Sequence, residues 1–169
     1  MNLRESIRAV VSRELQAVVR ELEAYPDEAA VWRVPPGITN SAGTLALHLE
    51  GNLRHFIGAE LGGSRYRRDR DREFERRRVP RAELIAGLER AVTEVDAGLA
   101  ALADDRLRDA FPTSFGEATI ETADFLVHLV SHLAFHLGQI DYHRRLVTGD
   151  NRSIGPLPMS ELASYGGEP

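Results

Sequence analysis

The sequence predicts an all-α fold, a four-helix bundle, and three observations carry this prediction. Apolar residues recur at helical spacing in four long segments of the chain. They rarely alternate with polar residues, and no Asn-Gly turn separates two β-branched runs, so strands are not indicated. Each segment has one apolar face that must be buried against another element. Four such helices favour a bundle whose functional sites lie on inward-facing positions.

The first helix is expected at residues 3–24, with Asn2 as its N-cap and Pro26 as the stop signal after it. Residues 26–40 are rich in proline and glycine and predict a turn-rich connection. The second helix then begins at residue 40 or 41 and ends at residue 61, where two glycines follow.

The third helix begins at Pro80, because proline suits a first helical position, and its apolar residues extend to Leu102. A long loop joins the second and third helices. Thr119 is the expected cap of the fourth helix, which runs to Val147. At about 1.5 Å per residue this helix is roughly 40 Å long and is the longest element.

Length and composition favour one globular domain. The chain has 169 residues, of which 43% are hydrophobic and 28% charged. We expect one domain over residues 1–169, with a bundle core at 3–149 and an extended tail at 150–169 that packs loosely on it. No apolar run approaches the ~20 residues that cross a bilayer, and no signal peptide precedes the first helix. We therefore expect no membrane partner and a cytoplasmic location.

The charged residues and the absence of cysteine exclude several classes of site. The net charge of −5 argues against a nucleic-acid partner. All 21 basic residues are arginine, so a Schiff-base lysine is excluded. The chain has no cysteine, so any metal ligand that it supplies must be a nitrogen or an oxygen.

Three histidines, His128, His132 and His136, lie four residues apart in an apolar stretch of the fourth helix. Four residues advance an α-helix by about 400°, so neighbouring histidines share one face and lie about 6 Å apart along the axis. Such a pair can bind one divalent ion. The outer two are about 12 Å apart, too far for bonds of about 2.0–2.1 Å to a common ion. The usable pair is His128 with His132 or His132 with His136, and spacing does not choose between them.

A third ligand must come from another helix, and His48 is the best candidate. It lies in the middle of the apolar face of the second helix, whereas His55 lies nearer the helix end. His143 is flanked by two arginines, which indicates a more exposed position. The alternative is that the histidines are core residues satisfied by hydrogen bonds, because an unpaired buried imidazole is costly.

Two segments carry a resemblance to a known family. His132-Leu-Ala-Phe-His136-Leu-Gly-Gln-Ile resembles the H-x-x-x-H-x-G-Q-[IL] signature of the DinB-like superfamily of metal-binding four-helix bundles. Leu45-Ala-Leu-His48-Leu-Glu-Gly-Asn52 resembles the histidine segment of its second helix, and residues 70–74 are similar to a loop element of one branch. The superfamily includes bacillithiol- and mycothiol-dependent transferases. The resemblance spans about residues 3–150.

The resemblance implies His48, His132 and His136 as ligands of Ni²⁺ or Zn²⁺, and leaves His128 as a neighbouring pocket or core residue. Three histidines with remaining positions taken by water describe an open site, as expected for catalysis. The implied activity is a metal-dependent thiol S-transferase that joins a small-molecule electrophile to a low-molecular-weight thiol such as mycothiol or bacillithiol. The alternative is a non-catalytic metal-binding or stress-associated bundle. The resemblance and the frequency of twofold oligomers favour a homodimer.

Asn52 and the arginine-rich segment each have two possible roles. Asn52, one turn beyond His48, donates a hydrogen bond into the pocket or bonds between helices. Eight arginines lie between Gly62 and Val79, interleaved with four acidic residues. This pattern is typical of a solvated, locally neutralised segment, and the alternative is recognition of an anionic substrate or thiol. A carboxylate is expected behind each ligand imidazole, but spacing does not tell which residue supplies it.

Overall fold

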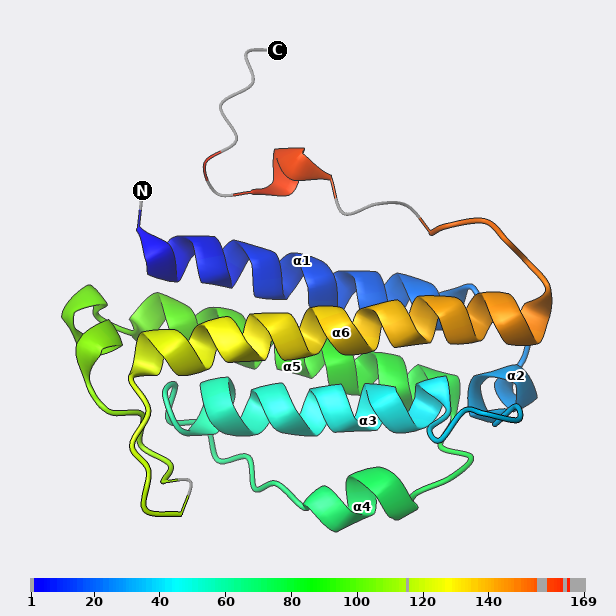
Figure 1. Ribbon diagram of the computed structural model, residues 1–169, viewed down its shortest axis with the longest axis horizontal. Helices are drawn as coiled ribbons and strands as arrows, with labels where there is room; N and C mark the ends of the chain where they lie inside the picture. The colour runs from blue at the N-terminus through cyan, green and yellow to red at the C-terminus, as the bar shows by residue number, and fades with distance from the viewer. Residues whose placement is uncertain (1, 115, 155–157, 163, 165–169) are drawn as a thin grey trace.

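The computed structural model describes residues 2–114, 116–154, 158–162 and 164. Four long helices lie side by side in these ranges (Figure 1): α1 (Leu3–Glu23), α3 (Ala42–Leu53), α5 (Arg81–Ala101) and α6 (Thr122–Thr148). Extended pairing over the same ranges is limited to one isolated bridge between Ala110 and Glu121. The predicted all-α bundle is therefore confirmed. Among these residues, no helix combines the length and apolar character that a membrane span requires.

The helices pack in a ring in which α1 contacts α5 and α6, and α3 contacts the same two helices from the other side. The helical spacing of α1 explains its place, because Val11, Leu15, Val18 and Leu22 fall on one face and are fully buried. Asn2 caps this helix as expected, and its side chain accepts a hydrogen bond from the Arg4 backbone at 3.0 Å. α3 and α6 run in opposite directions in Figure 1.

The connection at residues 26–40 contains a short helix, α2 (Glu28–Trp32). The prediction of a turn-rich connection did not include this helix. Asp27 caps it by accepting a hydrogen bond from the Ala30 backbone at 2.8 Å. Its last residue, Trp32, donates from Nε1 to the Val79 carbonyl at 3.1 Å. Five residues are too few for a periodic apolar pattern, so the helix is identified by its cap and its tertiary contacts.

The second predicted helix is α3 followed by a π-helical turn at Arg54–Ala59, and it ends before Gly62. Ser41 is the N-cap, and its Oγ accepts from the Thr44 backbone at 3.2 Å. Gly62 permits a close approach to α5, since a Cβ there would lie 2.7 Å from the Gly98 Cα.

Two predicted boundaries differ from the structure. The long loop holds a short helix, α4 (Arg70–Glu75), which lies along α3. The fourth long helix begins at Thr122, and its N-cap is Glu121 rather than the predicted Thr119. Thr122 binds the Asp109 carbonyl through both its backbone nitrogen and its hydroxyl, each at 2.9 Å, and this contact fixes the start of α6. A tertiary contact of this kind leaves no local sequence signal.

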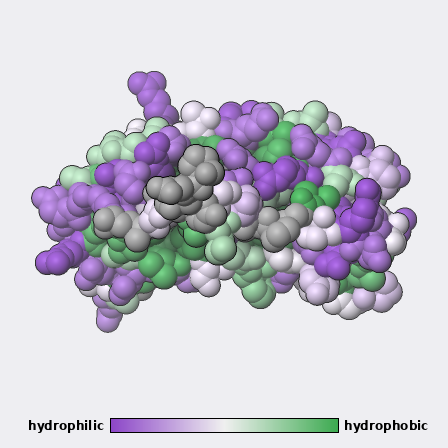
Figure 2. Space-filling model, turned by 90° about the horizontal axis from the view of Figure 1, so that it is seen from above, coloured by the Kyte–Doolittle hydropathy of each residue, from purple (hydrophilic) through white to green (hydrophobic). Residues whose placement is uncertain are grey.

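The C-terminal segment contains a 3-10 turn at Met159–Glu161 near α1. The Pro158 carbonyl accepts a bond from Arg13 Nη1 at 3.5 Å. The predicted tail residues 155–157, 163 and 165–169 lie outside the described ranges. Figure 2, seen from this side, shows hydrophilic and hydrophobic residues intermixed over the surface.

The last turns of α6 are fixed to α1 by a buried ion pair. Arg144 is fully buried, and its Nε donates to Glu21 Oε2 at 2.6 Å. Because both charges are shielded from water, removing either partner would leave the other uncompensated. The pair therefore holds the C-terminal half of α6, which carries part of the site, in a defined position.

Candidate metal centre

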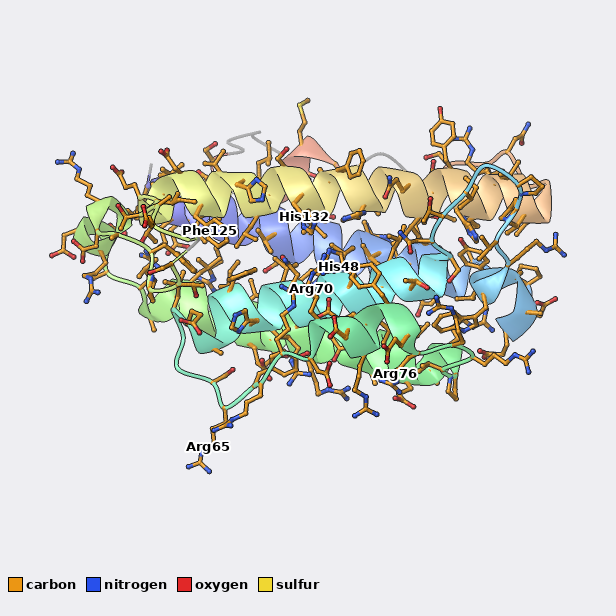
Figure 3. All side chains as sticks on the ribbon, turned by 60° about the horizontal axis from the view of Figure 1, so that its bottom comes forward. His48, Arg65, Arg70, Arg76, Phe125 and His132 are labelled. Atoms are coloured by element: carbon orange, nitrogen blue, oxygen red, sulfur yellow. The ribbon has the colours of Figure 1, made fainter. Side chains whose placement is uncertain are left out.

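His48 from α3 and His132 and His136 from α6 direct their Nε2 atoms to one point. The Nε2 of His132 lies 3.2 Å from that of His48 and 3.1 Å from that of His136. Figure 3 shows His48 and His132 facing each other between the two helices. Of the two pairs on α6 that the spacing allowed, the structure brings His132 and His136 together with His48.

Hydrogen bonds to the other ring nitrogens indicate that lone pairs converge at this point. The Glu73 carboxylate only accepts, so His48 Nδ1 donates to it at 3.0 Å and His48 Nε2 keeps its lone pair. In the same way His136 Nδ1 donates to Gln139 Oε1 at 2.7 Å. Two acceptor nitrogens therefore face the Nε2 of His132, which carries at most one proton.

The distances from the His132 nitrogen to the other two match those between ligands around a shared ion. With bonds of about 2.0–2.1 Å, two ligand nitrogens are about 2.9 Å apart at a right angle and about 3.4 Å apart at a tetrahedral angle. The observed 3.1 and 3.2 Å lie between these limits. The donor set thus fits a divalent ion that prefers imidazole, and the cluster could hold such a metal.

The surroundings of His132 and His136 favour the neutral form of both imidazoles. Burial, and to a smaller extent the positive charge that the neighbouring imidazoles can carry, lower the pKa of His132 to about 4. Burial also lowers the pKa of His136. A neutral imidazole presents a free lone pair, which is the form that binds a metal ion.

Glu73 is the carboxylate behind His48, a residue whose role the sequence could not assign. It lies on α4 and is only 6% exposed. Arg68 holds both of its oxygens, with Nε 2.7 Å from Oε1 and Nη2 2.8 Å from Oε2. Although burial opposes ionisation, the bonds from Arg68 and His48 lower the pKa of Glu73. An ionised carboxylate in this position orients the ring and makes it a stronger donor to a metal.

Gly51 leaves the space that the Glu73 carboxylate occupies. A Cβ at position 51 would lie 2.7 Å from Glu73 Cδ and would overlap its Oε1. The glycine one turn after His48 is therefore needed for the carboxylate to reach the imidazole. Phe74, the next residue of α4, places its ring 5.0 Å from the His48 ring and closes the same side.

His128 and Asn52 lie beside the centre without joining it. His128 is exposed and stacks on Phe125 and His132, with ring centroids 5.8 and 6.1 Å apart. Asn52 is 7% exposed, and its Oδ1 has no hydrogen-bond partner among the described residues. The Asn52 oxygen therefore does not make an interhelical hydrogen bond, which was one of the two interpretations of this residue.

The remaining two histidines, His55 and His143, lie outside the cluster. His55 is partly buried, with Nδ1 4.0 Å from Glu60 Oε1. The prediction of an exposed His143 is wrong, since its side chain lies in the core at 3% exposure. Its Nε2 donates to the Arg33 carbonyl at 2.8 Å, so Nδ1 accepts from the Tyr25 hydroxyl at 2.7 Å. One flanking arginine, Arg144, is itself buried, so the flanking charges did not indicate solvent.

The arginine-rich loop divides into buried and solvated parts. Arg68 lies under the loop against Glu73, and Arg70 lies over the Phe74 ring, 5.3 Å from its centroid. Arg65 extends into solvent in Figure 3. The loop is anchored through Phe74 on His48 and through Tyr66, which stacks under the Arg54 guanidinium at 4.2 Å. Only part of the segment is therefore the neutralised, solvated stretch that its charge pattern suggests.

Comparisons with known proteins give one result that covers most of the chain. No curated protein and no solved structure matches it significantly. A family model described as mycothiol-S-transferase matches residues 6–149, a range that includes all three converging histidines. The chain therefore belongs to the mycothiol-S-transferase family.

Proposed function

We propose that this protein transfers mycothiol to a small electrophile, with His48, His132 and His136 as the ligands of a divalent ion, Ni²⁺ or Zn²⁺. The observation that carries the proposal is the convergence of three Nε2 atoms at 3.1 and 3.2 Å, with lone pairs assigned by Glu73 and Gln139. Family membership supports the choice of thiol. Three protein ligands leave positions open for small molecules.

When bound, the ion would lower the pKa of a thiol near it, which supplies a nucleophile at neutral pH. In the transfer, the sulfur donates an electron pair to an electrophilic carbon and a C–S bond forms. The bond from that carbon to the leaving group breaks, and the leaving group departs with the electron pair. The thiol proton passes to solvent, so atoms and charge balance.

The chain's own residues position these groups. Glu73 and Arg68 hold the His48 ring with its Nε2 toward the centre. Asn52 Oδ1, buried and unpaired among the described residues, accepts a hydrogen bond from a hydroxyl group of the bound mycothiol. His128, exposed one turn before His132, passes the released proton to water. A cytoplasmic location and a homodimer remain part of the proposal.

Turnover by the metal-loaded protein tests this function. Mycothiol and 1-chloro-2,4-dinitrobenzene are supplied together, and conjugate is measured against mycothiol alone. We expect His132→Ala to lose at least about a hundredfold in kcat/KM, because the ligand set is broken. Wild-type protein with a full complement of metal that conjugates mycothiol to no chloride or epoxide would overturn the proposal. That result would favour the non-catalytic metal-binding alternative.

A further inference from the structure

A cavity of about 490 Å³ opens beside His136, on the side of the centre away from His128. It lies between the C-terminal half of α6, the start of α3 and the segment 37–40. Its apolar walls include Ile38, Leu45, Tyr142 and Leu146, and the rest of its lining is Gly37, Thr39, Asn40, His136, Gln139 and His143. The volume falls within the range of about 300–1,000 Å³ that is typical of small-molecule sites.

Among the residues that the structure describes, the lining of this cavity carries no aspartate, glutamate or arginine, although 28% of the chain is charged. A smaller cavity of about 320 Å³ under the arginine-rich loop is different, because it is lined by six charged side chains, Glu50, Arg67, Asp69, Arg72, Glu73 and Arg76. The cavity beside His136 therefore favours an uncharged molecule.

The cavity is held open by the protein itself. The segment before residue 37 is fixed to α6 twice, since Arg33 Nη1 donates to the Val147 carbonyl at 3.0 Å and the Arg33 carbonyl accepts from His143 Nε2 at 2.8 Å. After residue 40, Ser41 caps α3 and holds the other end of the segment. These bonds fix the wall in the absence of any ligand, so little order has to be created on binding.

Position along the bundle separates this cavity from the polar groups of the site. Because α3 and α6 are antiparallel, Leu45 and Leu146 lie toward one end of the bundle from the histidine cluster, and Asn52 and His128 lie toward the other. Mycothiol carries its cysteinyl thiol on a hydroxyl-rich pseudodisaccharide. Burying those hydroxyls against apolar walls without partners would be costly, whereas Asn52 offers an unpaired acceptor.

We propose that this cavity is the electrophile site, and that it takes uncharged, largely apolar molecules with the reactive carbon toward His136. The inference rests on the proposed function and adds the substrate class to it. Thiol and electrophile approach the centre from opposite ends of the bundle. The C–S bond then forms between them, and the leaving group departs with its electron pair as described above.

The test compares two exposed aliphatic residues of α6. Leu146 is 60% exposed and lines the cavity, whereas Val127 is 52% exposed and does not line it. With mycothiol and 4-nitrobenzyl chloride as substrates, Leu146→Arg is expected to raise the KM for the chloride at least about tenfold, because it places a charge in an apolar cavity. Val127→Arg should stay within about twofold of wild type. The KM for mycothiol and the metal content should not change in either variant.

Binding of 4-nitrobenzyl alcohol, which cannot react, is measured by calorimetry on the same variants and separates the two proposals. If wild type shows no turnover, the proposed function fails, while weaker binding of the alcohol to Leu146→Arg than to Val127→Arg still supports the cavity. Equal binding and equal KM in both arginine variants would overturn the inference. A rise in the KM for mycothiol alone in Leu146→Arg would also overturn it, because that result places the thiol in the cavity.

Discussion

Glu73 on α4 lies 3.0 Å from the Nδ1 of His48 on α3, which joins the arginine-rich loop directly to the histidine cluster. The carboxylate is buried and is held from behind by Arg68. The loop therefore contributes to the orientation of one imidazole of the cluster, although none of the loop residues belongs to the cluster. Its sequence pattern, interleaved arginines and acids, suggested mainly a solvated segment.

Replacing Glu73 by glutamine is expected to weaken metal binding by about 10- to 100-fold, because the substitution keeps the shape but removes the charge behind His48. The measurement is a competition titration of Zn²⁺ against a chromophoric chelator. Glu75→Gln is the matched control, since Glu75 is exposed on the same short helix. Equal affinities of Glu73→Gln, Glu75→Gln and wild type would show that Glu73 does not support His48.

Gly51→Ala is expected to weaken metal binding and to lower the free energy of unfolding, because its Cβ would displace the Glu73 carboxylate. Gly138→Ala is the control. A Cβ there meets no atom of the described residues within 4 Å, so replacing this helical glycine should raise the free energy of unfolding by up to about 1 kcal/mol. Urea unfolding of the metal-free proteins measures the free energy of unfolding of both variants.

The double variant Gly51→Ala with Glu73→Ala provides a further check on this steric relationship. Removing the carboxylate relieves the overlap, so stability should recover relative to Gly51→Ala while metal affinity stays low. A double variant no more stable than Gly51→Ala would mean that the methyl group clashes with something other than Glu73.

Sequence periodicity predicted the long helices well, because each buries one apolar face that repeats at helical spacing. The cap of α6 was placed two residues early, at Thr119 instead of Glu121, since Thr122 is fixed by the Asp109 carbonyl. The short helix α2 depends on Asp27 and on the Trp32 bond to Val79, neither of which has a periodic signature.

The sequence predicted part of the histidine cluster, as it predicted part of the fold. Helical spacing limited the α6 pair to two choices, and the resemblance selected His132 and His136, which the structure brings together with His48. Glu73 could not be assigned, because the path of the loop across α3 decides which carboxylate reaches the imidazole. His143 was misplaced because its neighbouring arginines suggested solvent, whereas Arg144 forms a buried pair with Glu21.

The buried His143 predicts that acid lowers stability. Burial lowers the pKa of its imidazole in the folded protein, so the unfolded chain binds more protons once the pH falls below about 6.5. This contribution to the free energy of unfolding is present above that pH and is lost as the pH falls toward the folded pKa. His132 and His136 act in the same direction in metal-free protein.

His143→Gln isolates the contribution of this residue, because glutamine does not titrate and can still donate toward the Arg33 carbonyl. Urea unfolding of metal-free protein at pH 7.5 and at pH 5, values chosen on either side of the ordinary histidine pKa, gives the loss of stability for each variant. The loss should be smaller in His143→Gln than in wild type. An equal loss in the two proteins would rule out His143 as a source of acid sensitivity.

The most direct measurement is elemental analysis of protein purified without chelator, for wild type, His132→Ala and His128→Ala. His132 holds the central nitrogen of the cluster, and His128 stands one turn away outside it. We predict about one divalent ion per chain in wild type and in His128→Ala, and none in His132→Ala. A metal-free wild type, or a His132→Ala protein that keeps its full nickel or zinc, would contradict the assignment on which the function depends.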